Sequence, residues 1–322
     1  MTPRSGSRGT EPVENRGQAA LRSDVERHTR LQSNMLKVLS RPTLRSPVLL
    51  CALSGWPDAG QAASGAVEYL IMKWAPRRFA ELDTSRAYVQ TNNRPRSKLT
   101  RGGQRRLIWP SFACYALPVP QAPRDLVLLL GPEPDLRWRT CAGAILDLAE
   151  ELGSDLVVSL GAYLAPTSHA GLVTLTGRGT RPELRRALTA LGLRDGKYEG
   201  PTGFLTVLQE ATVQRGLASA SVWAASPIYL RDLSNPKLSA ALLGVVEKVL
   251  RVDLQLTELE VAGRDLERRI DEELSRRPDL ERFVRRLATE SDIDLSEFAD
   301  AEDLLDDLEQ YLQRLRGEDD DD

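Results

Sequence analysis

Short apolar runs, bounded by glycine or proline, recur along this chain of 322 residues and alternate with helical patterns. Four runs share this form, and they cover residues 47–54, 125–130, 155–160 and 217–224. Continuous apolar runs of this length are typical of strands that are buried on both faces of a sheet. After the first run, small and apolar residues fall at helical spacing over 62–71. The alternation predicts an α/β fold, a sheet covered by helices on both sides.

The two ends of the chain carry opposite charge, which indicates how it is organised. Residues 1–46 have a net charge of +5 and residues 291–322 a net charge of −12. From residue 236 the chain reads as successive helices. We therefore predict four segments: a disordered basic segment at 1–46, an α/β core domain at 47–235, a helical extension at 236–290, and an acidic helix with a disordered tail at 291–322.

Within the predicted helical extension, apolar residues recur at helical spacing between Leu256 and Ile270. Such a stripe is typical of packing in the core or between subunits.

Composition argues against several classes of protein. The formal charge of −3 is not concentrated into a basic face, so no nucleic-acid partner is expected. No apolar run approaches the roughly 20 residues that cross a bilayer, and the N-terminus lacks the apolar stretch of a secretory signal. We expect a cytoplasmic protein with no membrane partner. Three cysteines without paired spacing and two histidines favour neither a disulfide scaffold nor a metal site, and no cofactor is expected.

Common catalytic motifs are missing from the sequence. It has no GxxxxGK[ST] phosphate loop, no GxGxxG after a strand, no HExxH and no GxSxG. A serine triad could use only His169, because the other histidine lies in the polar N-terminal segment. We therefore assign no catalytic residue and do not expect an enzyme.

The loops that follow the predicted strands are the candidate binding region. In open parallel sheets, ligands bind in the crevice outside the carboxyl ends of the strands. The candidate residues taken from these loops are Gly55, Trp56, Asp58, Gly60, Gly131, Glu133, Asp135, Gly161, His169, Gly200, Thr202 and Gly203.

Each ionisable candidate also has a structural interpretation. Asp58 can cap the helix that follows it. Glu133 and Asp135 can stabilise the positive end of the next helix dipole. His169 can be a loop histidine with internal partners, and Trp56 can either anchor an interface or cover the crevice.

Four of these loops, in this order, resemble the proteasome assembly chaperone 2 family. They are Gly-Trp-Pro-Asp-Ala-Gly at 55–60, Gly-Pro-Glu-Pro-Asp at 131–135, Tyr-Glu-Gly-Pro-Thr-Gly at 198–203, and Ser-Val-Trp-Ala at 221–224. The last is followed by Pro-Ile-Tyr at 227–229 and Asn-Pro at 235–236. The chain is similar to the bacterial, actinobacterial-type branch over roughly residues 47–290.

The resemblance implies a three-layer α/β/α sandwich, akin to purine nucleoside phosphorylases, with a helical C-terminal extension. It also implies homo-oligomers, often trimers, and eukaryotic relatives that chaperone assembly of the proteasome α-ring. We therefore expect a non-enzymatic protein-binding homo-oligomer, with proteasome-like protease subunits as candidate partners. The alternative is an enzyme of nucleoside or phosphorylase type that binds a small metabolite at the strand-end loops.

Overall fold

A computed structural model describes residues 35–83, 85–100, 102–231 and 233–289. Its strands are β1 Leu36–Val38, β2 Val48–Ser54, β3 Arg77–Leu82, β4 Arg96–Leu99, β5 Arg105–Ile108, β6 Phe112–Leu117, β7 Leu126–Pro132, β8 Leu156–Ala165, β9 Leu175–Gly179 and β10 Ala218–Pro227. Eight of them form one mixed sheet in the order β1-β3-β6-β7-β2-β8-β10-β9.

The four apolar runs of the sequence are the four parallel strands at the centre of this sheet. β7, β2, β8 and β10 pair in parallel, whereas β3, β6 and β9 are antiparallel to their neighbours. Residues 48–53 of β2 are each no more than 1% exposed. Burial on both faces explains why the run is uniformly apolar rather than alternating.

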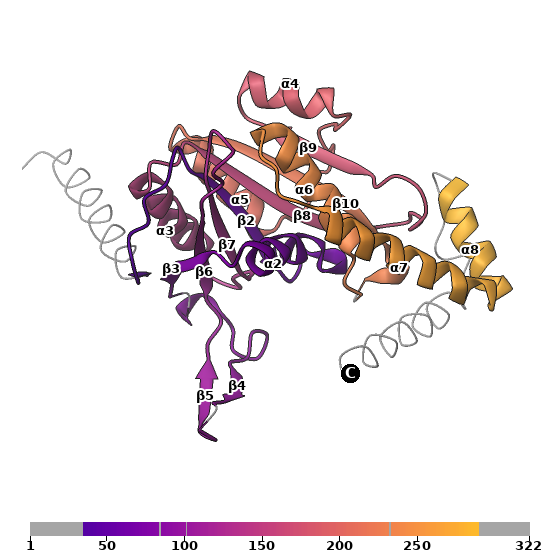
Figure 1. Cartoon of the computed structure of the whole chain (residues 1–322), viewed down its shortest axis with the longest axis horizontal. Coiled ribbons are helices and arrows are strands. Elements are labelled where there is room, and N and C mark those ends of the chain that lie inside the picture. Colours follow the sequence, from indigo (N-terminus) through magenta and orange to yellow (C-terminus); the bar gives the residue numbers. More distant parts are fainter. Residues whose placement is uncertain (1–34, 84, 101, 232, 290–322) are drawn as a thin grey trace, which may run out of the picture.

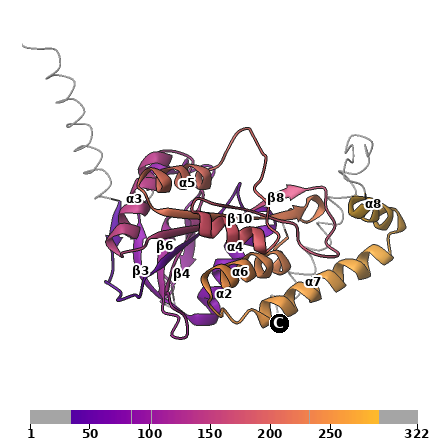
Figure 2. The ribbon, with the colours of Figure 1, turned by 90° about the horizontal axis from the view of Figure 1, so that it is seen from above.

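Helices cover both faces of the sheet (Figures 1 and 2). They are α2 Ala62–Trp74, α3 Trp138–Glu151, α4 Pro182–Ala190, α5 Phe204–Gln214, α6 Pro236–Leu250, α7 Thr257–Ser275 and α8 Pro278–Thr289, with short 3-10 turns η1 Ala59–Gln61, η2 Ser85–Ala87 and η3 Ile228–Leu230. Alternate β2 residues pack against different layers: Leu50 lies in a cluster with α2 and α6, and Leu49 in one with α3 and α5. The expected three-layer α/β/α sandwich is confirmed.

In the part of the chain that the structure describes, no helix combines the length and the apolar character that spanning a bilayer requires. Cys51, Cys114 and Cys141 are free thiols buried in the core.

The prediction of a disordered segment at 1–46 is wrong for residues 35–46. β1 pairs antiparallel with β3, and the Arg45 backbone N–H donates to Asp125 Oδ2 at 2.7 Å. The guanidinium of Arg45 also pairs with Asp125 Oδ1 at 2.9 Å. These partners are distant in sequence, so the local polar composition could not indicate them. The predicted disorder at residues 1–34 and the acidic helix and tail predicted at 291–322 lie outside the described residues.

The predicted boundary at residue 236 does not separate α6 from the core. α6 belongs to the same apolar cluster as the sheet, and the first part of α7, with Leu256 and Leu259, joins it. The second part of α7 and α8 lead away from the sheet (Figure 1) and form a third cluster with η3. The apolar stripe of α7 is thus used for packing within the chain.

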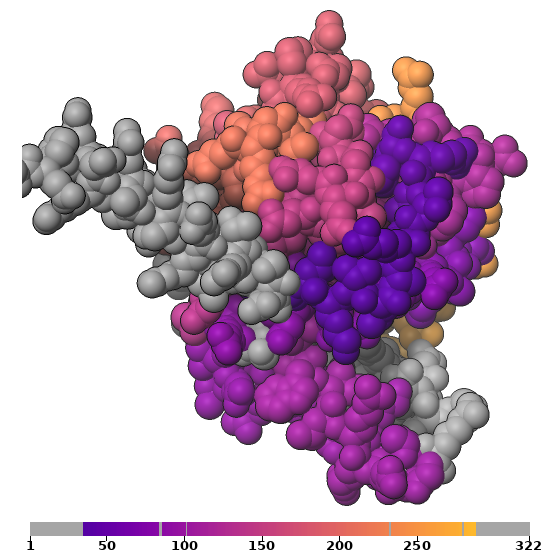
Figure 3. Space-filling view, turned by 90° about the vertical axis from the view of Figure 1, so that its left-hand side faces the viewer, coloured from indigo at the N-terminus to yellow at the C-terminus, as the bar shows by residue number. Residues whose placement is uncertain are grey.

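A separate hairpin of β4 and β5 extends away from the sandwich. It projects at the bottom of Figures 1 and 3, and all eight of its strand residues are exposed.

Candidate functional site

Three of the predicted loops meet at the carboxyl ends of β2 and β7. The backbone N–H of Glu133 donates to the Ser54 carbonyl at 2.8 Å. A Cβ on Gly55 would lie 3.7 Å from Glu133 Cβ, and one on Gly203 would lie 2.7 Å from Glu133 Oε1 and 3.0 Å from the Trp56 ring. Residue 203 must therefore lack a side chain for Trp56 and Glu133 to pack here. We name this surface the loop edge and define it as residues 55–60, 131–136 and 198–204.

Asp58 lies beneath this surface and caps α2. Its Oδ1 accepts hydrogen bonds from the backbone N–H groups of Ala63 (2.8 Å) and Ser64 (3.0 Å), and its Oδ2 accepts one from the Ser64 hydroxyl (2.5 Å). Burial raises the pKa of the carboxyl group to about 6, although these hydrogen bonds oppose the shift. The carboxylate is directed into the fold and towards the helix.

Glu133 and Asp135 hold neighbouring segments in place. Glu133 Oε1 accepts the backbone N–H of Phe204 at 2.7 Å, which satisfies the first turn of α5, and burial raises its pKa. Asp135 accepts hydrogen bonds from the Val89 backbone at 2.8 Å and from the side-chain amides of Asn92 and Asn93, both at 3.0 Å. Burial opposes ionisation of Asp135, but these hydrogen bonds outweigh it and lower its pKa.

Three further candidates are glycines at close approaches of the chain. A Cβ on Gly60 would lie 2.9 Å from Ser226 Oγ, and one on Gly161 would lie 2.5 Å from the Trp223 ring. Gly131 lies as close to the start of β6, where a Cβ would be 2.6 Å from a backbone oxygen. These close approaches account for glycine at all three positions, and at Gly60 the backbone φ of 63° also favours it. Gly200 and Thr202 are exposed on the loop that leads to α5.

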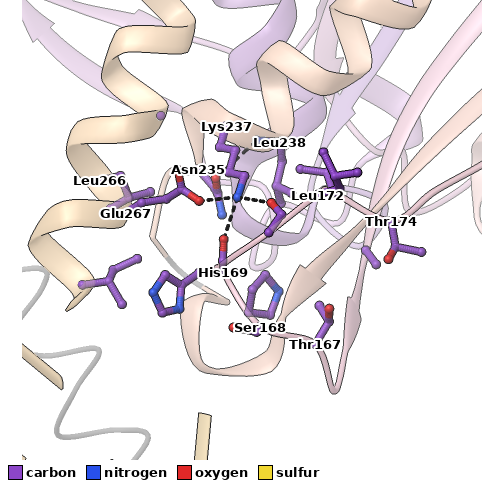
Figure 4. Close-up of a pocket in the computed structure, with 16 residues that line it drawn as sticks. Thr167, Ser168, His169, Leu172, Thr174, Asn235, Lys237, Leu238, Leu266 and Glu267 are labelled. Atoms are coloured by element: carbon purple, nitrogen blue, oxygen red, sulfur yellow. Dashed lines mark hydrogen bonds and ion pairs between the residues drawn. The ribbon is translucent and has the colours of Figure 1, made fainter. Parts of the chain in front are cut away.

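His169 lies apart from the loop edge and contacts the C-terminal helices (Figure 4). Its backbone N–H donates to the Tyr229 hydroxyl at 2.7 Å, and its Nδ1 lies 2.8 Å from the same oxygen. A carboxylate oxygen can only accept a hydrogen bond, so the contact with Asp271 assigns a proton to Nε2, and in the neutral ring Nδ1 then accepts from the Tyr229 hydroxyl. Nε2 lies 3.0 Å from Asp271 Oδ1 and donates to it. Burial raises the pKa of Tyr229, so the phenol stays neutral.

Lys237 adds further contacts to α7, and we name His169, Tyr229, Lys237 and Asp271 the anchor of α7. Its ammonium donates to the carbonyls of His169 (2.7 Å) and Gly171 (2.6 Å) and pairs with Glu267 on α7, as Figure 4 shows. The cavity beside them measures about 20 Å³, which is room for about one water molecule. The cluster fastens the segment after β8 to α7, and it has no space for a metabolite.

A wider depression of about 400 Å³ lies between α3 and α5 and contains none of the predicted residues. Arg215 at its rim pairs with Asp147 on α3 at 2.7 Å. In the described ranges, no group of three or more His, Cys, Asp or Glu residues is arranged to hold a metal ion.

At the loop edge, three carboxylates are held by hydrogen bonds within the chain, whereas three large side chains with apolar surface are exposed. Trp56 is 64% exposed, Leu136 49% and Tyr198 71%. Asp58, Glu133 and Asp135, by contrast, make their hydrogen bonds within the chain. Exposed aromatic and apolar side chains on a rigid support are what protein partners bind.

Tyr229, Lys237 and Asp271, the partners of His169, are not among the residues predicted from the sequence. Tyr229 belongs to the Pro-Ile-Tyr stretch noted in the sequence, which is the one sequence feature that could have indicated a partner for His169. Asp271 and Lys237 lie in helices that show no local sign of this contact.

Replacement of Tyr229 by Phe should lower the free energy of unfolding by about 1–3 kcal/mol, because the backbone N–H and Nδ1 of His169 lose their buried partner. Urea unfolding measures the change, and amide exchange should rise in the second part of α7 and in α8. Tyr198→Phe is the matched control, since the Tyr198 hydroxyl contacts Pro201 at an exposed site. Unaltered exchange in α7 and α8 would contradict the anchoring role.

Comparison with known proteins identifies the family. The model of the PAC2 family matches residues 52–274. A PAC2 family protein from Streptomyces avermitilis is 40% identical, with 70% of this chain and 95% of that chain covered and a TM-score of 0.65. A proteasome-assembly chaperone homologue from Mycobacterium tuberculosis is 35% identical, with 78% and 99% covered and a TM-score of 0.64.

An archaeal proteasome activator from Pyrococcus furiosus shares the fold at 20% identity, with 74% of this chain and 97% of that chain covered and a TM-score of 0.59. No curated protein matches the sequence. The family match spans more than half of the chain and includes the loop edge and the anchor of α7. The chain therefore belongs to the PAC2 family.

Proposed function

We propose that this chain is a chaperone-type assembly factor that binds other proteins through the loop edge. In this proposal it is a cytoplasmic homo-oligomer, and unassembled proteasome subunits are its clients. The observation that carries the proposal is Trp56, which is 64% exposed and packs beside Gly203. An aromatic side chain held in this way loses little conformational freedom when it enters a partner's pocket.

Relatives support the class of partner. The Mycobacterium tuberculosis protein, 35% identical over 78% of this chain, is described as a proteasome-assembly chaperone homologue. Membership of the PAC2 family points the same way.

The geometry of the ionisable groups favours binding over catalysis. A general acid or base must reach the reacting atom, at about 3 Å. Asp58, Glu133 and Asp135 instead hold α2, α5 and the segment that contains Val89. These three carboxylates stabilise the segments that carry the exposed apolar side chains of the loop edge.

Trp56→Ser tests this surface. We expect the affinity for purified, unassembled proteasome subunits to fall by about 30-fold or more, because a central Trp commonly contributes 2 kcal/mol or more to an interface. Sedimentation velocity at a series of concentrations measures the affinity and also the mass of the chain alone.

Met72→Ser is the matched control for this experiment. Met72 is 76% exposed and lies in the last turn of α2. α2 connects β2 to β3, and these two strands run in the same direction, so Met72 lies near the opposite end of the strands from the loop edge. Equal weakening by both substitutions, or by neither, would overturn the assignment of the loop edge.

A further inference from the structure

The hairpin of β4 and β5 leaves the molecule at the loop edge. β6, which follows the hairpin, begins beside the end of β7, where a Cβ on Gly131 would touch the Ser111 oxygen and Phe112. On the other side, Asp135 binds Asn92 and Asn93, just before the hairpin. We name residues 94–109 the arm (Figures 1 and 3).

The arm is strongly cationic and lacks counter-charges. No Asp or Glu occurs between residues 84 and 124. The described basic residues of the arm are Arg94, Arg96, Lys98, Arg105 and Arg106. Within the described ranges none of them forms an ion pair, although Arg105 contacts the Ser97 hydroxyl at 3.5 Å.

Strand register concentrates this charge on one face. Arg96 lies opposite Ile108, and Lys98 lies opposite Arg106. Residues that face each other across an antiparallel pair project from the same face, so three cations and Ile108 share it. Like charges placed directly opposite destabilise a sheet, and a lone two-stranded hairpin is only marginally stable in water. This face, defined by Arg96, Lys98 and Arg106, therefore suits an anionic partner, whose charge would offset the repulsion.

We propose that the cationic face binds the acidic segment 291–322 of this chain. This segment has a net charge of −12, which complements the arm. It begins two residues after Thr289, where the described chain ends. Its 32 residues can span up to about 110 Å when extended, against a radius of gyration of about 20 Å for a globule of this length. Reach therefore does not restrict the contact, and tethering raises the effective concentration of the segment.

Zero-length carbodiimide coupling on the full chain tests the contact, because it joins a lysine only to a carboxylate that touches it. Lys98 is the arm's lysine, and the exposed Lys197 and Lys248 are internal controls. We expect Lys98 to couple to Asp or Glu of 291–322 at least about fivefold more than either control, and salt at 0.5 M to reduce this coupling.

The double variant Arg96→Ala and Arg106→Ala keeps Lys98 while removing its neighbours. Coupling of Lys98 should fall about five- to tenfold, since each exposed ion pair contributes a few-fold. Arg185→Ala with Arg186→Ala is the matched control, because both side chains are exposed on α4 and the charge change is the same. Equal coupling of the three lysines, or coupling that the arm variant does not reduce, would overturn the proposal. Coupled product at the monomer mass places the contact within one chain, and product at the dimer mass places it between two copies.

A nucleic acid is the competing occupant of a cationic arm. A chain that ends at residue 290 retains all described elements, and fluorescence anisotropy compares its binding to a labelled 291–322 peptide and to a labelled single-stranded oligonucleotide. We expect the peptide to bind more tightly at 0.15 M salt. Tighter binding of the oligonucleotide, lost in the arm variant, would assign the arm to nucleic acid and overturn the proposal.

Discussion

Gly161→Ala should lower the free energy of unfolding by about 3 kcal/mol, the upper part of the range for an overpacked core. The added Cβ would lie 2.5 Å from the Trp223 ring, which packs over Gly161 from the neighbouring strand. Urea unfolding of both single variants and of the double variant Gly161→Ala with Trp223→Leu measures the coupling. We expect the double variant to be more stable than the sum of the single effects by about 1–3 kcal/mol.

Gly131→Ala provides the matched comparison, because the added Cβ would collide with a backbone atom that no side-chain substitution removes. A Cβ there would lie 2.6 Å from the Ser111 carbonyl oxygen as well as from the Phe112 ring. Phe112→Leu should therefore not rescue it. Additive effects at Gly161 and Trp223, or full rescue at Gly131, would contradict the packing that we assign to these glycines.

The second large effect is a pH dependence from Asp58. Burial raises its pKa in the folded chain from 3.8 to about 6, so the folded state binds more protons than the unfolded state between these values. The free energy of unfolding therefore falls as pH rises from about 4 to 6, and this group accounts for about 3 kcal/mol of the fall.

Asp58→Asn keeps an oxygen for the Ala63 and Ser64 N–H groups but cannot titrate. Its stability curve should lack this component, so that the variant gains relative to the wild-type chain as pH rises through 6. Asp135→Asn is a control of opposite sign. Because the pKa of Asp135 is lower in the folded chain, its ionised form stabilises the fold above the unfolded pKa, and this stabilisation is lost as pH falls. Parallel curves for Asp58→Asn and the wild-type chain would refute the assignment.

The centre of the fold could be predicted because its signal is local. Four continuous apolar runs became β2, β7, β8 and β10, since a strand buried on both faces has little place for polar residues. α4 and α5 are not among the expected elements. The first turn of α5 is completed by Glu133, 71 residues away, and no local pattern reveals that contact.

The sequence predicted where the candidate site lies better than it predicted what each residue does there. The rule that ligands bind at the carboxyl ends of parallel strands brought three loops together correctly, and they converge on Trp56 and Gly203. His169 does not join them, because Tyr229 and Asp271, 60 and 102 residues away, hold it against α7. The cationic arm was missed because a net charge near zero conceals an acid-free stretch that is balanced by the acidic C-terminal segment.

Assembly kinetics of purified proteasome subunits measure the proposed chaperone activity itself. The yield of assembled particles is followed by native electrophoresis with this chain, with its Trp56→Ser variant, and without either. We expect faster assembly with the wild-type chain and no acceleration with the Trp56→Ser variant, while Met72→Ser behaves as wild type. Identical assembly curves in all conditions would contradict a chaperone role for this protein.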